Sequence, residues 1–214
     1  MKKNEITKAL EKAICKNHSG KMDGMASMST SPINPICEAR AKDENSICSK
    51  CFSRAMLDRF GTLGQKLLNN SELLSREVYS VEDMPKLNYM SFRLEAFGDL
   101  TNTNQVKNYF NLCKANPFTR FTLWTKNPNY INEVLEEGIE KPNNLIIIYS
   151  SPFLNAPADG IRNRYTFIDK VFTVYTKEYA TAHDIKINCG AKKCLTCLLC
   201  YLDTDTTEIN ELLK

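Results

Sequence analysis

Most of the nine cysteines in this chain fall into two groups whose spacing suits a metal centre. The C-terminal cysteine group lies in NCGAKKCLTCLLCY, residues 188–201, with the spacing C-x4-C-x2-C-x2-C. Its members are Cys189, Cys194, Cys197 and Cys200. Two cysteines separated by two residues can direct both thiolates at one centre, but a third and a fourth in the same run must diverge. A cubane cluster offers such divergent corners, whereas a single zinc ion needs four converging sulfurs.

The C-terminal spacing therefore favours a [4Fe–4S] cluster, with zinc as the alternative. Zinc sites usually take two pairs of cysteines that lie some distance apart in the sequence. The opening C-x4-C-x2-C also matches plant-type [2Fe–2S] proteins, in which the fourth ligand lies further along the chain.

The upstream cysteine group consists of Cys37, Cys48 and Cys51, in ICEARAKDENSICSKCF, with the spacing C-x10-C-x2-C. Three thiolates do not complete a four-cysteine site. Either a fourth ligand comes from elsewhere, or one iron stays open for water, substrate or a cofactor. Two other interpretations remain. A zinc or cluster site could serve only to tie the loop down, or one cluster could draw cysteines from both groups.

The other cysteines and the histidines are not assigned to a centre. Cys113 lies on an apolar helix face, where a buried free cysteine behaves as a small hydrophobe. Cys15 flanks the apolar stripe of the first helix. His18 and His183 lack ligand-like spacing, so we interpret them as surface or capping residues. No phosphate-binding, nucleophile-elbow or zinc-protease motif is present.

Composition indicates a globular protein of a reducing compartment. The chain has 214 residues, 43% hydrophobic and 25% charged, and a formal net charge of +3, too small to indicate nucleic-acid binding. No run approaches the roughly 18 apolar residues of a membrane span. The first 20 residues predict a short amphipathic helix rather than a signal peptide. We therefore expect a cytoplasmic protein, in which clustered cysteines bind metal rather than form disulfides.

Hydrophobic patterns predict strands that alternate with helices. We expect strands over 22–28, 89–96, 118–125, 145–149, 171–175 and 185–187. We expect helices from Phe52 onward with a break at Gly61 or Gly64, after a cap at Thr101 or Thr103, after Pro128, and beyond Asp203 through Ile209, Leu212 and Leu213.

This alternation predicts an α/β fold with a parallel sheet, either an open sheet or a partial (βα)6-type barrel. The chain is expected to form a single domain. Residues 1–20 would form the N-terminal helix and 21–188 the βα core, while 189–214 would hold the cysteine-rich segment and a terminal helix.

Ligands of such folds gather at the carboxyl ends of the strands. The first strand is followed by the upstream cysteine group and the last by Cys189, so both groups are expected at one rim. The other residues expected there are Glu95, Gly98, Asp99, Thr125, Lys126, Ser150, Ser151 and 175–177. Each has a plainer explanation, because Gly-Asp is more often a turn, Thr125 and Ser150 can cap helices, and Lys126 can be solvated.

The order of these motifs resembles the partial barrel of radical S-adenosylmethionine enzymes. In that family three cysteines bind a [4Fe–4S] cluster whose fourth iron binds the cofactor. The resemblance implies that Cys37, Cys48 and Cys51 are ligands and that Gly98 and Asp99 lie near the cofactor amino group. The chain departs from the family pattern C-x3-C-x2-C, because ten residues separate the first two cysteines and Lys50 replaces the aromatic residue before the third.

The chain also resembles the "gene product 88" family of phages and bacteria, over most of residues 21–201. The similarity is carried by the Ser/Pro loop before the upstream cysteines, by RLEAFGD and TLWTKNP, and by NCGAKKCLTCLLCY. This resemblance implies an iron–sulfur protein of a phage or its host and names no substrate.

These features predict a protein with at least one [4Fe–4S] cluster at the C-terminal cysteine group and a second or shared cluster at the upstream group. Its role would be electron transfer with a ferredoxin or flavodoxin as redox partner, or radical chemistry with S-adenosylmethionine. The alternative is a zinc-stabilised module that docks on a host protein or on nucleic acid.

Overall fold

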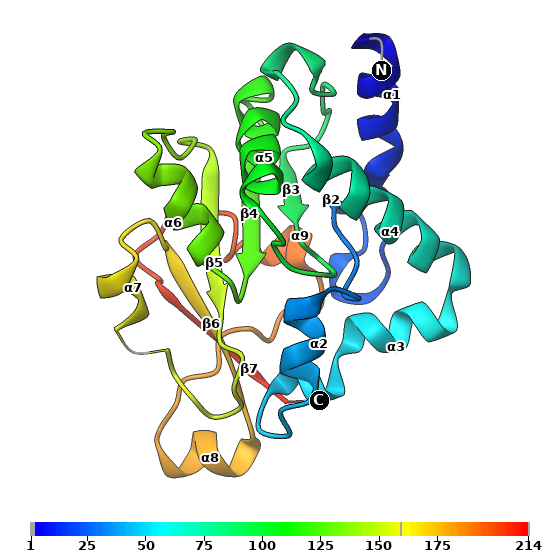
Figure 1. Cartoon of the computed structure of the whole chain (residues 1–214). Coiled ribbons are helices and arrows are strands. Elements are labelled where there is room, and N and C mark those ends of the chain that lie inside the picture. Colours follow the sequence, from blue (N-terminus) through cyan, green and yellow to red (C-terminus); the bar gives the residue numbers. More distant parts are fainter. Residues whose placement is uncertain (1–2, 159, 214) are drawn as a thin grey trace.

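Short runs rich in β-branched and aromatic residues form one sheet in the computed structural model, which describes residues 3–158 and 160–213 (Figure 1). Within these residues the strands are β1 (Ile14–Cys15), β2 (Ala26–Met28), β3 (Ser91–Leu94), β4 (Arg120–Thr125), β5 (Leu145–Ser150), β6 (Lys170–Tyr175) and β7 (Glu208–Leu212). The seven strands lie in the order β1 to β7, and the sheet is open.

Each strand from β2 onward pairs in parallel with the next strand along the chain, whereas β1 pairs antiparallel with β2. In the register of the central strands, Leu94 of β3 lies opposite Met28 of β2 and Leu123 of β4. Because the six strands from β2 to β7 run in one direction, their carboxyl ends meet at one edge of the sheet, the carboxyl edge.

Helices and short helical turns connect the strands. The described ones are α1 (Lys3–Ala13), η1 (Gly20–Met22), α2 (Pro35–Ala41), η2 (Ile47–Lys50), α3 (Phe52–Arg59), α4 (Gly61–Arg76), η3 (Val81–Asp83), α5 (Thr103–Ala115), α6 (Asn129–Glu136), α7 (Ile161–Arg164), α8 (Lys177–Ala182) and α9 (Cys194–Cys197). None of them is both long enough and apolar enough to cross a membrane.

Helices cover one face of the sheet, which we call the helix face. Phe92, Leu94, Phe121 and Ile147 point to this side and are fully buried among side chains of α1, α4, α5 and α6. Figure 1 shows α5 lying across β3 and β4. Burial of a large apolar side chain contributes about 1.5–3 kcal/mol, so this interface supplies much of the stability of the fold.

A cysteine-rich segment, residues 188–204, covers the other face, which we call the inner face. Ile148, Phe172 and Ile209 form a second apolar cluster there, against which Cys189, Leu199, Cys200 and Trp124 pack. In Figure 1 the short helix α9 of this segment is seen behind the strands. The segment therefore takes the place that a second layer of helices would occupy in a sheet covered by helices on both faces.

Most of the expected elements are confirmed. The strands expected near 22–28, 89–96, 118–125, 145–149 and 171–175 correspond to β2 to β6, and the helices after Phe52 break at Phe60, before Gly61. The cap of α5 is different from the prediction, because the Asn102 side chain, not a threonine, accepts the backbone N–H of Gln105. The parallel, open α/β sheet is confirmed.

The C-terminal elements were predicted wrongly. Residues 185–187 form no strand, and the region expected as a terminal helix is the strand β7, which pairs with β6. The chain at Asn188 and Cys189 lies along the other side of β7, where both N–H groups donate to the Asn210 carbonyl. At the N-terminus, the helix expected over 1–20 ends at Ala13, and β1 follows it.

The strand at the C-terminus predicts unequal effects of two substitutions. Ile209 is fully buried on the inner face, whereas Leu213 is 51% exposed. Ile209→Ala should lower the free energy of unfolding by about 2–5 kcal/mol, and Leu213→Ala by less than about 0.5 kcal/mol. Urea denaturation followed by circular dichroism measures both. Equal losses would indicate the helical face through Ile209, Leu212 and Leu213 instead.

Candidate metal centre

A cavity of about 320 Å³ lies between the carboxyl edge of the sheet and the cysteine-rich segment. The strand ends contribute Glu95, Gly98, Asp99, Thr125, Lys126 and Ser150 to its wall. The loop of the upstream cysteine group contributes Ile47 and Ser53, and the C-terminal group contributes Cys189, Cys194 and Cys200. The fold thus brings three cysteines of the C-terminal group and the loop that carries the upstream group to one cavity, although about 140 residues separate them in the sequence.

The C-terminal cysteine group is positioned by tight local turns. Cys194 and Cys197 begin and end α9, which stops at Leu198 because that residue has a left-handed backbone (φ 52°) and donates its N–H to the Cys194 carbonyl. Cys189 is held from the other side, since Lys21 Nζ lies 3.1 Å from its carbonyl oxygen and 3.6 Å from its sulfur. The sulfur-bearing turns therefore face the inner side of the sheet.

These thiols lie close enough to affect one another electrostatically. The pKa of Cys200 is raised to about 12, chiefly by burial; Arg93 lowers it, and the neighbouring Cys189, Cys194 and Cys197 contribute smaller raising effects. Burial also raises the pKa of Cys194, against the lowering effect of Arg93. Thiols that oppose one another's ionisation in this way become good ligands when a cation neutralises the set.

The upstream cysteine group is held by helix α2 and turn η2. Asn34 caps α2: its side-chain oxygen accepts the Cys37 N–H at 2.9 Å, and its amide nitrogen donates to the Cys37 sulfur at 3.3 Å. Ser46 accepts the Cys48 N–H at 3.1 Å. Burial and then the charge of Asp99 raise the pKa of Cys37 to about 12, with smaller raising effects from Cys48 and Cys51. The three thiols therefore share one neighbourhood.

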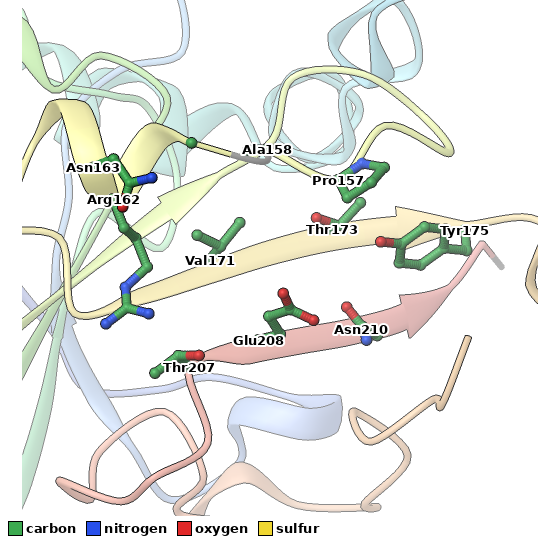
Figure 2. A pocket seen from close by; sticks show the side chains of 11 residues that line it. Pro157, Ala158, Arg162, Asn163, Val171, Thr173, Tyr175, Thr207, Glu208 and Asn210 are labelled. Atoms are coloured by element: carbon green, nitrogen blue, oxygen red, sulfur yellow. The ribbon is translucent and has the colours of Figure 1, made fainter. Parts of the chain in front are cut away.

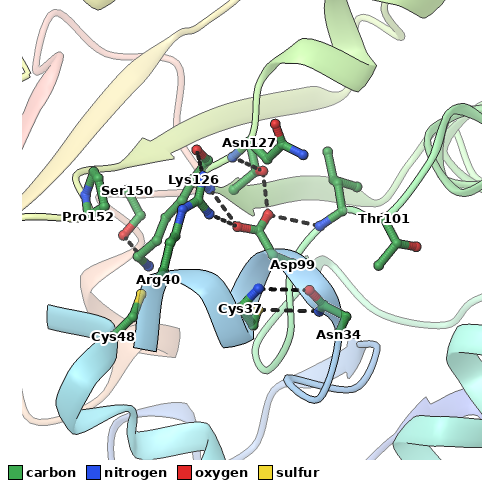
Figure 3. A network of polar contacts seen from close by, with 12 residues as sticks. Asn34, Cys37, Arg40, Cys48, Asp99, Thr101, Lys126, Asn127, Ser150 and Pro152 are labelled. Carbon is green, nitrogen blue, oxygen red and sulfur yellow. Dashed lines mark hydrogen bonds and ion pairs between the residues drawn. The ribbon is translucent and has the colours of Figure 1, made fainter. Parts of the chain in front are cut away.

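Asp99 connects this cysteine loop to the sheet (Figure 3). One carboxylate oxygen accepts from Arg40 at 3.1 Å and from the Lys126 N–H at 3.0 Å, and the other accepts from the Leu100 N–H and the Thr125 hydroxyl. Arg40 also donates to the Lys126 carbonyl at 2.7 Å. Asp99, expected to bind a cofactor, thus uses both oxygens to fasten α2, which carries Cys37, to the ends of β3 and β4.

The carboxyl group of Glu95 is likewise hydrogen-bonded to other residues of the protein. It is 2% exposed, has a left-handed backbone (φ 57°), and accepts hydrogen bonds from Thr30, Gln105 and Tyr109. Burial raises its pKa from the usual 4.5 to about 8, although the hydrogen bonds from Tyr109 and Thr30 act in the opposite direction. The protonated acid can donate to Thr30 Oγ1, which in turn donates to the Asp99 carbonyl at 3.2 Å.

Gly98 and Lys126, also expected at the site, line the cavity too. Gly98 has a φ of +45°, and a Cβ there would lie 2.5 Å from the Thr30 carbonyl oxygen. Only glycine therefore lets the backbone segments at residues 98 and 30 approach each other this closely. The Lys126 ammonium group donates to the Ser150 hydroxyl at 3.1 Å. A positive charge therefore stands at the cavity wall beside hydroxyl groups.

Sequence reasoning missed several residues of this cavity, among them Arg93, Trp124 and Lys21. The Arg93 guanidinium lies over the Trp124 ring, 4.2 Å from its centroid, and both project onto the inner face. An arginine in the middle of the strand SFRL, at a position that alternates with two core residues, is the signal that indicates such a site. His18, interpreted as a surface or capping residue, is half-buried and bonds Ser27 at 2.8 Å.

The donor set fits a thiolate-bound centre. Every cysteine is a free thiol, and thiolates are the ligands that iron–sulfur clusters and zinc prefer. In the described ranges, no three or more cysteine, histidine or acidic side chains are gathered closely enough to coordinate a metal ion in the arrangement present.

A second cavity, of about 180 Å³, lies beside β6 and β7 on the helix face (Figure 2). Its wall includes Arg162, Thr173, Tyr175, Glu208 and Asn210. Of the residues expected at the rim from the sequence, it contains Tyr175, and its wall includes no cysteine.

The raised pKa of Glu95 predicts a pH dependence of stability. The folded protein keeps a proton that the unfolded chain releases above about pH 4.5, so the stability from protonated Glu95 is lost as the pH rises toward 8. Compared with Glu95→Gln, the wild type should lose on the order of 4 kcal/mol between pH 4.5 and 8.5. Urea denaturation of both proteins across this range measures the difference. A difference that stays constant with pH would contradict the assignment.

Comparison with known proteins identifies a family. No curated protein and no solved structure matches the chain. A family model described as "Gene product 88" matches residues 2–207, which include both cysteine groups and every residue of the candidate centre except Glu211. The resemblance seen in the sequence motifs is thereby confirmed, and the chain belongs to the gene product 88 family.

Proposed function

We propose that this protein binds iron–sulfur clusters and acts in electron transfer. The observation that carries the proposal is the placement of Cys189, Cys194, Cys197 and Cys200 on neighbouring turns, within electrostatic reach of one another, over the inner face of the sheet. Their compact spacing suits a [4Fe–4S] cluster, which supplies one-electron transfer when bound. A ferredoxin or flavodoxin would be a suitable redox partner.

The residues around this group have distinct roles in the proposal. Lys170, buried on the inner face, donates to the Leu199 carbonyl at 2.9 Å and to the Thr204 hydroxyl at 3.2 Å. Lys21 bridges Cys189 and Glu211. These contacts hold the cysteine-rich segment against the sheet, while short turns between the cysteines let the sulfurs turn toward a common centre. Binding would thus complete the packing of the segment.

The upstream group would hold a second cluster or contribute to a shared one. The order of β2 to β7, six parallel strands each beside its successor, is the strand order of a partial (βα)6 barrel, and it supports a cofactor at the carboxyl edge. Cys37, Cys48 and Cys51 offer three thiolates beside the cavity, which leaves one iron of a [4Fe–4S] cluster open.

That open position favours a second candidate function, S-adenosylmethionine chemistry in the cavity. Gly98 and Lys126 border the space in which the cofactor would bind. The upstream thiolates would hold the cluster, and Asp99 would hold α2 and hence Cys37 in place.

Metal analysis after anaerobic reconstitution with iron and sulfide tests the proposal. Each [4Fe–4S] cluster should add about four iron atoms per chain and a brown colour. Cys197→Ala should remove most of the iron of the C-terminal centre, because exposed Cys197 offers a ligand and little packing. The matched control Cys113→Ala, in the core of α5, should keep its iron.

A third variant, Cys51→Ala, distinguishes a protein with one cluster at each cysteine group from a protein with a single shared cluster. If each group holds its own cluster, Cys197→Ala and Cys51→Ala should each lose about half of the iron, and if the cluster is shared, both should lose nearly all. A colourless wild type that contains zinc would overturn the proposal and support a zinc-stabilised binding module. Loss of iron from Cys113→Ala would show that a ligand had been misplaced.

The second candidate predicts a product that can be measured. Incubated with S-adenosylmethionine and dithionite, the cluster-loaded protein should break the sulfur–carbon bond with one electron from the reductant. The products would be methionine and 5′-deoxyadenosine, the latter taking a hydrogen atom from substrate or medium. Liquid chromatography detects the nucleoside, and Cys51→Ala should form at least about tenfold less. Absence of product from iron-replete wild type would leave electron transfer as the function.

A further inference from the structure

A half-buried arginine, Arg93, faces the C-terminal cysteine group. Phe92 and Leu94 on either side of Arg93 in β3 point into the helix-face core, so Arg93 points to the inner face, where the cysteine-rich segment lies. Its guanidinium lies 4.2 Å from the centroid of the Trp124 ring. The position is therefore fixed by a strand in the middle of the sheet and by the stacking on Trp124.

The charge of Arg93 has no anionic partner among the described residues. The ion pairs found in residues 3–158 and 160–213 do not include it, and its guanidinium donates a weak hydrogen bond to the Met22 sulfur at 3.7 Å. Its Nε is buried without a hydrogen-bond acceptor, and so is the indole N–H of Trp124. Two such buried donors are costly unless an acceptor is supplied to them.

Two thiols of the C-terminal cysteine group lie within electrostatic reach of Arg93, as do Tyr201 and His18. The positive charge of Arg93 lowers the pKa of both Cys194 and Cys200, against the effect of burial. These two cysteines line the same cavity as Arg93 and Trp124. Two other cations lie near the group. Lys21 is paired with Glu211 at 2.6 Å, and Lys170, which also acts on Cys200, donates to the Leu199 carbonyl and the Thr204 hydroxyl. Arg93 differs from both, because its buried Nε has no hydrogen-bond acceptor among the described residues.

We propose that Arg93 is the charge partner of the four-thiolate centre and raises its reduction potential. The inference rests on the proposed function, because it requires a cluster at the C-terminal group. A centre ligated by four thiolates is anionic, and each added electron makes it more negative. A fixed cation beside it stabilises the reduced form more than the oxidised form. Trp124 positions the guanidinium and presents a second N–H toward the acceptor-rich group.

The test compares variants that change the charge and the shape separately. Arg93→Met removes the charge, and Arg93→Lys keeps it without the planar guanidinium. Arg162→Met is the matched control, because it removes the same charge from an exposed position beside the second cavity (Figure 2). All are reconstituted anaerobically, analysed for iron and sulfide, and titrated with dithionite while the reduced cluster is followed by electron paramagnetic resonance.

The expected result is a midpoint potential that shifts to more negative values in Arg93→Met, with wild-type potential in Arg162→Met and a smaller shift in Arg93→Lys. Loss of iron from folded Arg93→Met, with retention in Arg93→Lys, would equally support the charge role. An unchanged midpoint in iron-replete Arg93→Met would overturn the inference, as would iron loss from both Arg93 variants in the folded state.

Two further controls keep these results interpretable. If Arg93→Met does not fold, as judged by circular dichroism, Arg93→Gln takes its place, since it is polar and uncharged, and the same results decide. The iron content of the wild type is measured first. Wild type without iron refutes the proposed function and, with it, this inference, whereas iron-replete wild type with an unmoved midpoint in the variant refutes the role of Arg93 alone.

Discussion

Parallel strands must be buried on both faces, and in this protein a cysteine-bearing segment, not a helix layer, buries the second face. Leu199, Cys189 and Cys200 pack against Ile148, Phe172 and Ile209, so the same turns that complete the core also present the thiols. The segment contains only one four-residue helix and is held by Lys170 and Lys21. A metal centre that binds the cysteines of this segment would therefore stabilise the fold of the whole sheet.

The polar residues of the carboxyl edge divide into two kinds. The carboxyl oxygens of Asp99 and Glu95 accept hydrogen bonds from other parts of the protein. Asp99 joins α2 to the ends of β3 and β4, and Glu95 joins the segment after β2 to α5. The cavity that these two residues line is also lined by thiols, lysine and arginine. The two cysteine groups consequently differ in their surroundings, because a carboxylate acts on the upstream group and a cation acts on the C-terminal group. Two centres so placed would differ in potential.

The sequence predicts the parallel sheet well because its strands carry strong local signals. The run LIIIY is apolar on both sides, and in the structure Ile147 faces the helices while Ile148 faces the cysteine-rich segment. The last strand was predicted as a helix because Ile209, Leu212 and Leu213 also fit a helical spacing. The segment forms a strand because β7 pairs with β6, and this long-range contact cannot be inferred from a local sequence pattern.

The location of the candidate site could be predicted from the sequence, but the roles of its individual residues could not. The ends of the predicted strands pointed to the carboxyl edge, where the loop of the upstream group and three cysteines of the C-terminal group border the cavity. The same reasoning expected Glu95 and Asp99 to face a ligand, since a sequence does not reveal which donors will surround a carboxylate. It also overlooked Arg93, whose significance depends on the segment that arrives about 100 residues later to cover it.

We propose that the sulfurs over the inner face hold an iron–sulfur core. Diffraction data from crystals grown without oxygen, collected on both sides of the iron absorption edge, would reveal it. We expect anomalous iron peaks within bonding distance of the sulfurs of Cys189, Cys194, Cys197 and Cys200. Sulfurs paired with one another, or gathered around a peak that appears only at the zinc edge, would contradict it.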